Sequence, residues 1–264
     1  MVALIADVAV SMLLVISPAK TLDETPMHEE VGATIPRFWK ECAPLVQQLQ
    51  AMSVAELADL MDISPKLAQL NVERYAAFPS NVDASNSKPA IFCFDGDVYD
   101  AITPELYDGT QRAFMQEHVR ILSGLYGMIR PLDRLYPYRL EMGTKLHGTS
   151  LYDFWGKRVT NALNDDAKMM GAKHLINLAS QEYNRVIQRR DLIPAIVDVD
   201  FRHVKADKLV TIGVHAKKAR GAMVDFIVRH GITHPEEMKD FAAMGYAYAA
   251  QHSNAQTMVF VHTS

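Results

Sequence analysis

Short apolar segments alternate with longer amphipathic stretches along most of this sequence, and the alternation limits the fold more than any other feature. Runs of about four to eight apolar residues are typical of buried strands, and the helical patterns between them favour crossover connections. The sequence therefore predicts an α/β protein with a mixed sheet. The segments expected to be strands are residues 13–16, 90–94, 118–122, 173–179, 195–201, 209–215 and 258–261.

Helices are expected over residues 35–78, over about 219–230, and from Pro235 to about 244. The first of these breaks near residue 64, because Ser64 is a natural N-cap and Pro65 a natural first helical residue. No stretch resembles a long linker, so residues 12–264 are predicted to form one compact domain. A second methionine, Met12, directly precedes the first strand, and residues 1–11 are interpreted as an N-terminal extension.

The composition, with 49% hydrophobic and 22% charged residues, is that of an ordinary globular protein. The two cysteines, Cys42 and Cys93, indicate a reducing cytoplasm and not a disulfide framework. The N-terminus is apolar, but it lacks a basic residue before Lys20 and contains Asp7, so neither a secretion signal nor a membrane span is expected. Since no Cys or His pair has metal-ligand spacing and no nucleotide fingerprint is present, we expect neither a metal nor a cofactor.

Positive charge is concentrated in two distant segments of a chain whose net charge is −4. Residues 112–145 hold six basic and three acidic side chains, and residues 202–220 hold six basic and one acidic. If these segments meet in space, they form a positive surface that attracts phosphate-bearing ligands. The alternative is that they belong to two unrelated solvated faces.

The segment from Ser123 to Lys145 is the densest polar stretch and follows an expected strand, which is where ligands bind in open α/β sheets. Glycines there allow a ligand to approach the backbone, and the cations suit a phosphate. The alternative is a structural loop held by its own Arg–Asp and Arg–Glu pairs. Together with polar residues that follow two other strands, the expected cleft-lining set is Ser17, Ser123, Gly124, Gly127, Glu141, Asn177 and Ser180.

A second cationic cluster, Lys217, Lys218 and Arg220, is expected at a strand-to-helix junction. There its charges would add to the free N–H groups of the helix start and create an anion site. The alternative is a solvated helix face.

Residues 57–75 have the pattern of two helices joined by a short hairpin. In a helix-hairpin-helix element the second helix presents its N-terminal N–H groups to a nucleic-acid phosphate, and Ser64 and Lys66 would face that phosphate. Asp62 and Ser64 stand where that motif has glycines, and residues 53–78 carry four acidic and two basic side chains. A plain helical hairpin explains the same pattern.

Several blocks, in order along the chain, resemble the YaaA peroxide-stress family. They include Ile16–Asp23, Phe94–Tyr99, Leu122–Gly127, Arg130–Asp133, Pro137–Gly143, Tyr152–Trp155, Asn177–Ser180 and Lys217–Gly221. The resemblance implies a cytoplasmic bacterial protein that lowers unincorporated iron and so limits oxidative damage. It also implies a compact α/β fold with a helix-hairpin-helix-like element and a positive cleft that bind DNA. Carried onto this sequence, the nucleic-acid-binding residues are Lys20, Ser64, Lys66, Arg130, Arg139, Lys145, Lys217, Lys218 and Arg220.

The leading hypothesis is therefore a stress-response protein that binds the DNA backbone with little sequence preference and has no catalytic residues. No membrane and no stable protein partner are implied. The alternative is an enzyme that acts on a small phosphorylated or nucleotide-like substrate in the same cleft. A deep, narrow pocket would favour the small molecule, whereas a groove as wide as a duplex would favour DNA.

Overall fold

The central strand of the fold is β1 (Met12–Ile16), whose five side chains are completely buried. The computed structural model describes the whole chain apart from residues 1–10, 28–31, 84–86, 207 and 263–264. The predicted N-terminal extension, residues 1–11, thus lies outside the described residues except for Ser11. Because β1 is covered on both faces, its sequence is an unbroken apolar run.

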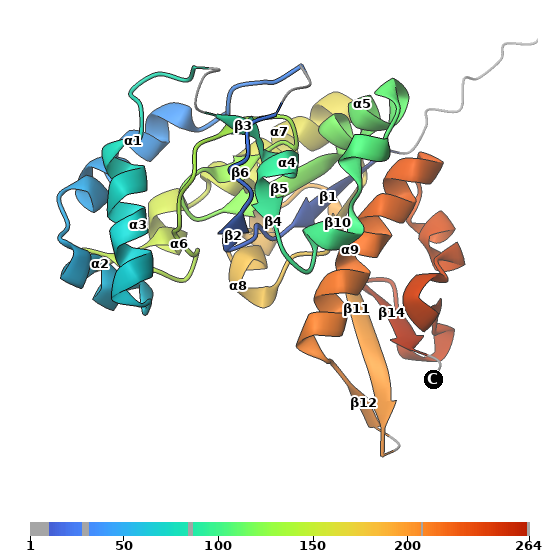
Figure 1. Ribbon diagram of the computed structural model, residues 1–264. Helices are drawn as coiled ribbons and strands as arrows, with labels where there is room; N and C mark the ends of the chain where they lie inside the picture. Colours follow the sequence, from blue (N-terminus) through green and yellow to red (C-terminus); the bar gives the residue numbers. More distant parts are fainter. Residues whose placement is uncertain (1–10, 28–31, 84–86, 207, 263–264) are drawn as a thin grey trace, which may run out of the picture.

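The described residues form an eight-stranded mixed sheet in a single compact α/β domain, as the sequence predicted (Figure 1). The strand order is β13-β14-β11-β10-β1-β5-β6, with β12 paired to β11. β1, β5, β10, β11 and β14 are parallel to their neighbours in this group, whereas β6, β12 and β13 are antiparallel additions. Besides β1 the strands are β5 (Val119–Ser123), β6 (Gly127–Ile129), β10 (His174–Asn177), β11 (Ala195–Lys205), β12 (Lys208–Val210), β13 (Tyr246–Tyr248) and β14 (Thr257–His262).

Helices cover both faces of this sheet. The chain crosses from β1 to β5 in one direction and returns past β1 to reach β10; α5 contacts β1, and α7 contacts β6. α5 also contacts α9, which packs against β11 (Figure 1). The α-helices are α1 (Trp39–Gln50), α2 (Val54–Met61), α3 (Pro65–Ala76), α4 (Ala90–Cys93), α5 (Gly109–His118), α6 (Leu151–Trp155), α7 (Arg158–Met170), α8 (Gln181–Asn184) and α9 (Gly213–His230).

Short strand pairs and 3-10 turns connect these elements. Each pair fixes a loop beside the sheet; β2 with β4, for example, ties the segment after β1 to the segment before Tyr99. The short strands are β2 (Thr21–Leu22), β3 (Lys88–Pro89), β4 (Phe94–Asp95), β7 (Arg134–Leu135), β8 (Lys145–Leu146) and β9 (Thr149–Ser150). The 3-10 turns are η1 (Tyr99–Ala101), η2 (Pro104–Leu106), η3 (Arg189–Asp191), η4 (Pro235–Asp240), η5 (Ala243–Gly245) and η6 (Ala250–His252).

The break predicted in the first helical region is confirmed. α2 ends at Met61, Asp62 adopts a left-handed conformation, and Ser64 caps α3 by accepting a hydrogen bond from the Leu67 N–H at 3.4 Å. α2 and α3 therefore form a helical hairpin at the left of Figure 1. Its identity as a DNA-binding motif stays a prediction.

Three predicted elements are wrong. Residues 90–94 form the helical turn α4 followed by β4, and the N–H groups of Ala90 and Ile91 in the first turn bond to the carbonyls of Asp133 and Pro131. The strand expected over 209–215 ends at Val210, and α9 begins at Gly213, six residues earlier than predicted. In place of the helix expected from Pro235 the chain forms the two short turns η4 and η5. Met244, inside η5, has a positive φ that a continuous helix does not allow.

Candidate functional site

The chain adds strands on one side of β1 and then on the other, so the carboxyl ends of β1 and β10 form the topological switch point of the sheet. The chain leaves β1 toward β5 on one side, while β10 continues toward β11 on the other, and ligands of open α/β sheets bind in the crevice between such strands. Val15 pairs with Asn177, and the Leu178 N–H donates to the Val15 carbonyl at 2.9 Å. The two chain segments thus leave the sheet side by side.

A hydrogen-bonded cluster joins these two segments. The Ser180 N–H donates to Ser17 Oγ at 2.9 Å, and the Tyr99 hydroxyl donates to the Ser17 carbonyl, also at 2.9 Å. Burial raises the pKa of Tyr99 well above its ordinary value, so this hydroxyl keeps its proton. Tyr99 therefore fixes the backbone that follows β1.

A cleft of about 470 Å³ opens beside this cluster, and we call it the β1–β10 cleft. Its volume lies in the range of small-molecule sites, about 300–1,000 Å³. The walls combine the segment after β1, the loop after β4, the segment after β10 and one side of α9. The lining residues are Ser17, Pro18, Ala19, Lys20, Thr21, Asp95, Gly96, Asp97, Val98, Tyr99, Leu178, Ser180, Glu182, Tyr183, Lys217 and Arg220.

Most of the cations predicted for this site are paired with carboxylates. Glu141 Oε1 lies 3.2 Å from Lys20 Nζ and 3.1 Å from Arg139 Nη2, so one acid compensates two cations. Lys217 Nζ lies 3.9 Å from Asp97 Oδ2. The positive potential of the cleft is consequently smaller than its count of basic residues indicates.

Arg220 is different, because it forms no salt bridge with any described residue. Its Nε is buried and has no hydrogen-bond partner in the described part of the chain. Burial lowers the pKa of the guanidinium, and the nearby charge of Asp200 opposes that shift only in part. Arg220 is therefore a half-buried cation that faces the cleft with an unused donor.

The environment of Arg220 and Lys217 differs from the predicted one. Since α9 begins at Gly213, both residues lie in its second turn and not at its first N–H groups. The expected contribution of free helix N–H groups is therefore wrong for this cluster, and only the side chains are available to an anion. Lys218, in the same turn, does not line the cleft.

Ser123, Gly124 and Gly127 lie in the core, away from the cleft surface. Ser123 Oγ is 2.6 Å from the Tyr138 hydroxyl and accepts from the Tyr126 N–H. A Cβ on Gly124 would lie 2.2 Å from the Leu140 carbonyl oxygen, and one on Gly127, whose φ is +67°, would lie 2.8 Å from the Trp155 ring. The backbone approach that these glycines permit is thus to the protein's own loop and indole.

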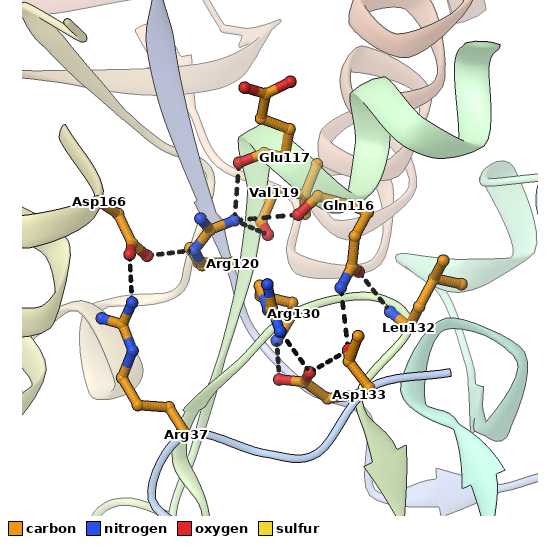
Figure 2. A network of polar contacts seen from close by, with 10 residues as sticks. Arg37, Gln116, Glu117, Val119, Arg120, Arg130, Leu132, Asp133 and Asp166 are labelled. Atoms are coloured by element: carbon orange, nitrogen blue, oxygen red, sulfur yellow. Dashed lines mark hydrogen bonds and ion pairs between the residues drawn. The ribbon is translucent and has the colours of Figure 1, made fainter. Parts of the chain in front are cut away.

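Arg130 lies at the opposite end of the sheet. It follows β6, which runs antiparallel to β5, and therefore stands beside the start of β5, whereas the cleft is at the carboxyl ends of the strands. Its N–H donates to Asp133 at 2.7 Å and its guanidinium contacts the same carboxylate at 3.5 Å (Figure 2). Arg130 is not brought together with Lys20 or Arg220.

The remaining predicted residues are distributed around the cleft. Asn177 lines a smaller pocket on the far side of Arg220. Lys145 is exposed on the hairpin β8–β9, shortly after Gly143, whose N–H donates to Glu182 at 3.0 Å. Ser64 and Lys66 are exposed at the start of α3, outside the residues that line the cleft.

Sequence reasoning missed several lining residues, chiefly Asp95, Asp97 and Tyr99. The loop containing Asp95 and Tyr99 was noted only as a block of the family resemblance, although acidic residues around a glycine after an apolar segment are a usable signal. Among the described residues, no three His, Cys, Asp or Glu side chains are placed to hold a metal ion. In the same part of the chain no helix combines the length and apolar character needed to cross a bilayer.

Fold and site together define an open α/β protein with a candidate ligand cleft at the switch point of its sheet. Comparison with known families extends this result: the chain belongs to the family described as peroxide stress protein YaaA, whose model matches residues 12–252. It is 46% identical over 258 residues to a UPF0246 protein of Cupriavidus pinatubonensis and 44% identical over 255 residues to one of Paraburkholderia xenovorans. Both alignments cover 94% of this chain and 98% of the relative.

Proposed function

We propose that this member of the peroxide-stress family binds a small phosphorylated or nucleotide-like ligand in the β1–β10 cleft. The observation that carries the proposal is Arg220, a half-buried cation that forms no salt bridge with a described residue and lines a cleft of metabolite size. A guanidinium with an unused buried donor gains a charge-assisted hydrogen bond when a phosphate oxygen enters. The other cations at the cleft already have carboxylate partners and add little.

The dimensions of the cleft support a small molecule over a duplex. A cavity of about 470 Å³ is walled by chain segments from four parts of the fold. Apolar atoms of Pro18, Val98 and Leu178 contribute to the lining, which suits a sugar or base more than a phosphate backbone alone.

The test is Arg220→Gln, with Arg158→Gln as the matched control, because Arg158 is an exposed arginine on α7 outside the cleft. Calorimetric titration with inorganic phosphate and with nucleoside monophosphates is expected to show binding to the parent chain and to the control. Arg220→Gln is expected to weaken that binding at least about tenfold, the equivalent of one charged hydrogen bond. Equal affinity of all three proteins, or no binding by any, contradicts the proposal.

The same variants link the site to stress resistance. In cells that lack the protein, the parent chain and Arg158→Gln are expected to restore survival after peroxide exposure. Arg220→Gln is expected not to restore it, although the variant accumulates to the same level. Full rescue by Arg220→Gln would show that resistance to peroxide does not depend on this residue of the cleft.

A second candidate function is DNA binding that limits iron-driven oxidative damage. It is favoured by three cations, Lys66, Lys145 and Lys218, that form no ion pair with any described residue. Lys66 lies in the first turn of α3, whose N-cap Ser64 is exposed. Backbone phosphates would contact such residues without reading sequence.

This candidate is tested by fluorescence anisotropy with unrelated duplexes at several salt concentrations. Each phosphate contact that is removed should reduce the slope of log affinity against log salt by about one. Lys66→Gln, and the triple change of Lys217, Lys218 and Arg220 to Ala, are expected to weaken binding to all duplexes alike. Unchanged slopes in both variants would exclude these residues as DNA contacts.

Protection from iron is measured as the number of DNA breaks after peroxide exposure. Cells with the protein are expected to show fewer breaks than cells without it, and an iron chelator is expected to abolish this difference.

A further inference from the structure

A second pocket of about 240 Å³, which we call the side pocket, lies across Arg220 from the β1–β10 cleft. Arg220 lines both cavities. The end of β10 and the segment after it contribute to both: residues 178, 180, 182 and 183 line the cleft, whereas residues 177, 179, 181 and 184 line the side pocket. A ligand anchored on Arg220 is therefore in reach of both.

Two residues that line the side pocket each carry a buried polar side-chain atom without a partner. Asn184 Oδ1 is an acceptor without a donor, and Arg220 Nε is a donor without an acceptor, among the described residues. A buried polar atom without a partner destabilises the folded protein, and a ligand that supplies the missing partner removes that cost. A hydroxyl group both donates and accepts, and thus matches this pair of atoms.

Two carboxylates add acceptors to the same pocket. Asp198 and Asp200 alternate with Val199 on β11 and both line the pocket. Arg189 holds Asp198 through two hydrogen bonds of 2.7 and 2.8 Å, and Asn177 Nδ2 donates to it at 2.7 Å. Burial opposes ionisation of Asp198, but these donors outweigh it and keep the pKa of its carboxyl below the ordinary value. A carboxylate fixed beside the carboxyl end of β10 is suited to accept hydrogen bonds from neighbouring sugar hydroxyls.

The side pocket is large enough to hold only part of a ligand. It is smaller than the roughly 300 Å³ from which whole-ligand sites begin. We propose that the side pocket binds the hydroxyl-bearing part of a phosphorylated sugar whose phosphate contacts Arg220. This inference rests on the proposed function, because it requires Arg220 to bind the anionic group.

The experiment compares three probes on the full chain by calorimetric titration: inorganic phosphate, ribose 5-phosphate and 2-deoxyribose 5-phosphate. Ribose 5-phosphate is expected to bind at least about tenfold tighter than phosphate, and the deoxy sugar to lose part of that gain. Asn184→Leu is expected to remove most of the preference for the sugar and to leave phosphate affinity unchanged. Asn161→Leu, an exposed position on α7, is the matched control.

A stability measurement separates a ligand contact from a structural one. Because Asn184 Oδ1 bonds to nothing in the described chain, Asn184→Leu is expected to keep or raise the Tm of the ligand-free protein. If Tm falls and the sugar preference survives, Asn184 has a structural role and the inference is wrong. It is also wrong if both sugars bind no tighter than phosphate while Arg220→Gln still abolishes phosphate binding, an outcome that leaves the proposed function intact. If none of the three probes binds, the proposed function fails as well.

Discussion

Arg120 and Asp166 form a buried ion pair between β5 and α7, with Arg120 Nε 2.6 Å from Asp166 Oδ2 and at most 5% of either side chain exposed. Figure 2 shows that Asp166 also contacts Arg37, and that Arg120 donates to the carbonyls of Gln116, Glu117 and Val119. One carboxylate thus compensates two arginines, and Nη1 of Arg120 donates to carbonyls at the end of α5 and the start of β5. Through Arg120 the pair connects α7 with the end of α5.

Replacement of Asp166 by Asn is expected to destabilise the fold by about 3–5 kcal/mol, because it leaves the buried Arg120 charge without compensation. Urea unfolding monitored by circular dichroism measures the change. Asp165→Asn, at the exposed neighbouring position, should stay within about 0.5 kcal/mol of the parent. A loss below about 1 kcal/mol for Asp166→Asn would mean that solvent reaches Arg120 and that the pair is not a stabilising centre.

Local signals explain which parts of the fold were predictable. The strand β1 is predictable from its own apolar run, and the start of α3 from Ser64 followed by Pro65. No such signal marks the start of α9, because Thr211–Gly213 contains β-branched residues and a glycine and has no side-chain cap. Residues 90–93 form the turn α4, whose first N–H groups bond to the carbonyls of Asp133 and Pro131, some 40 positions away, and no local pattern encodes these contacts.

The charge of the site was predictable only in part for a similar reason. Arg139 and Glu141 are two positions apart, and Arg130 and Asp133 three apart, so these pairs follow from the sequence. Lys217 is paired with Asp97, which is far away in sequence. Among the cations that line the cleft, only Arg220 forms no salt bridge with a described residue. This difference depends on how α9 packs on the loop after β4. Only the fold reveals it.

A cluster of histidines predicts a pH-dependent stability. His203 Nε2 lies 2.8 Å from the Tyr246 hydroxyl and 3.2 Å from His215 Nδ1, and its ring stacks on His262 at 4.6 Å. Burial and these two histidines lower the pKa of His203. The unfolded chain therefore binds a proton more readily, and stability is expected to fall as pH falls below about 6.5.

His203→Gln is expected to make the thermal midpoint less dependent on pH between about pH 5 and pH 8, since the group that titrates differently in the two states is gone. Differential scanning calorimetry at a series of pH values measures this. His252→Gln, at an exposed position, should reproduce the pH dependence of the parent. A steeper dependence in His203→Gln would show that the neutral imidazole is not the form that the cluster favours.

Glu141 is expected to limit anion binding in the β1–β10 cleft. Its carboxylate compensates both Lys20 and Arg139, so Glu141→Gln leaves two cations beside the site without a partner. Affinity for inorganic phosphate should increase about two- to fivefold at low ionic strength, a modest gain because Lys20 is largely exposed. The gain should diminish with added salt. Glu117→Gln, on the exposed side of α5, should leave phosphate affinity unchanged; an equal gain there would indicate an effect of net charge alone.

Close contact between α9 and the loop after β4 makes Gly221 necessary for the cleft. A Cβ at this position would lie 1.8 Å from the Val98 carbonyl oxygen, so Gly221→Ala must push the helix away from the loop. We expect a loss of about 1–3 kcal/mol in urea unfolding, together with weaker phosphate binding, because Val98 and Arg220 line the same cavity. Gly213→Ala in the same helix meets no atom within 4 Å and should be neutral or stabilising by up to about 1 kcal/mol. If Gly221→Ala behaves like Gly213→Ala in both measurements, α9 is not packed against the loop as described, and Arg220 is not held at the cleft by that contact.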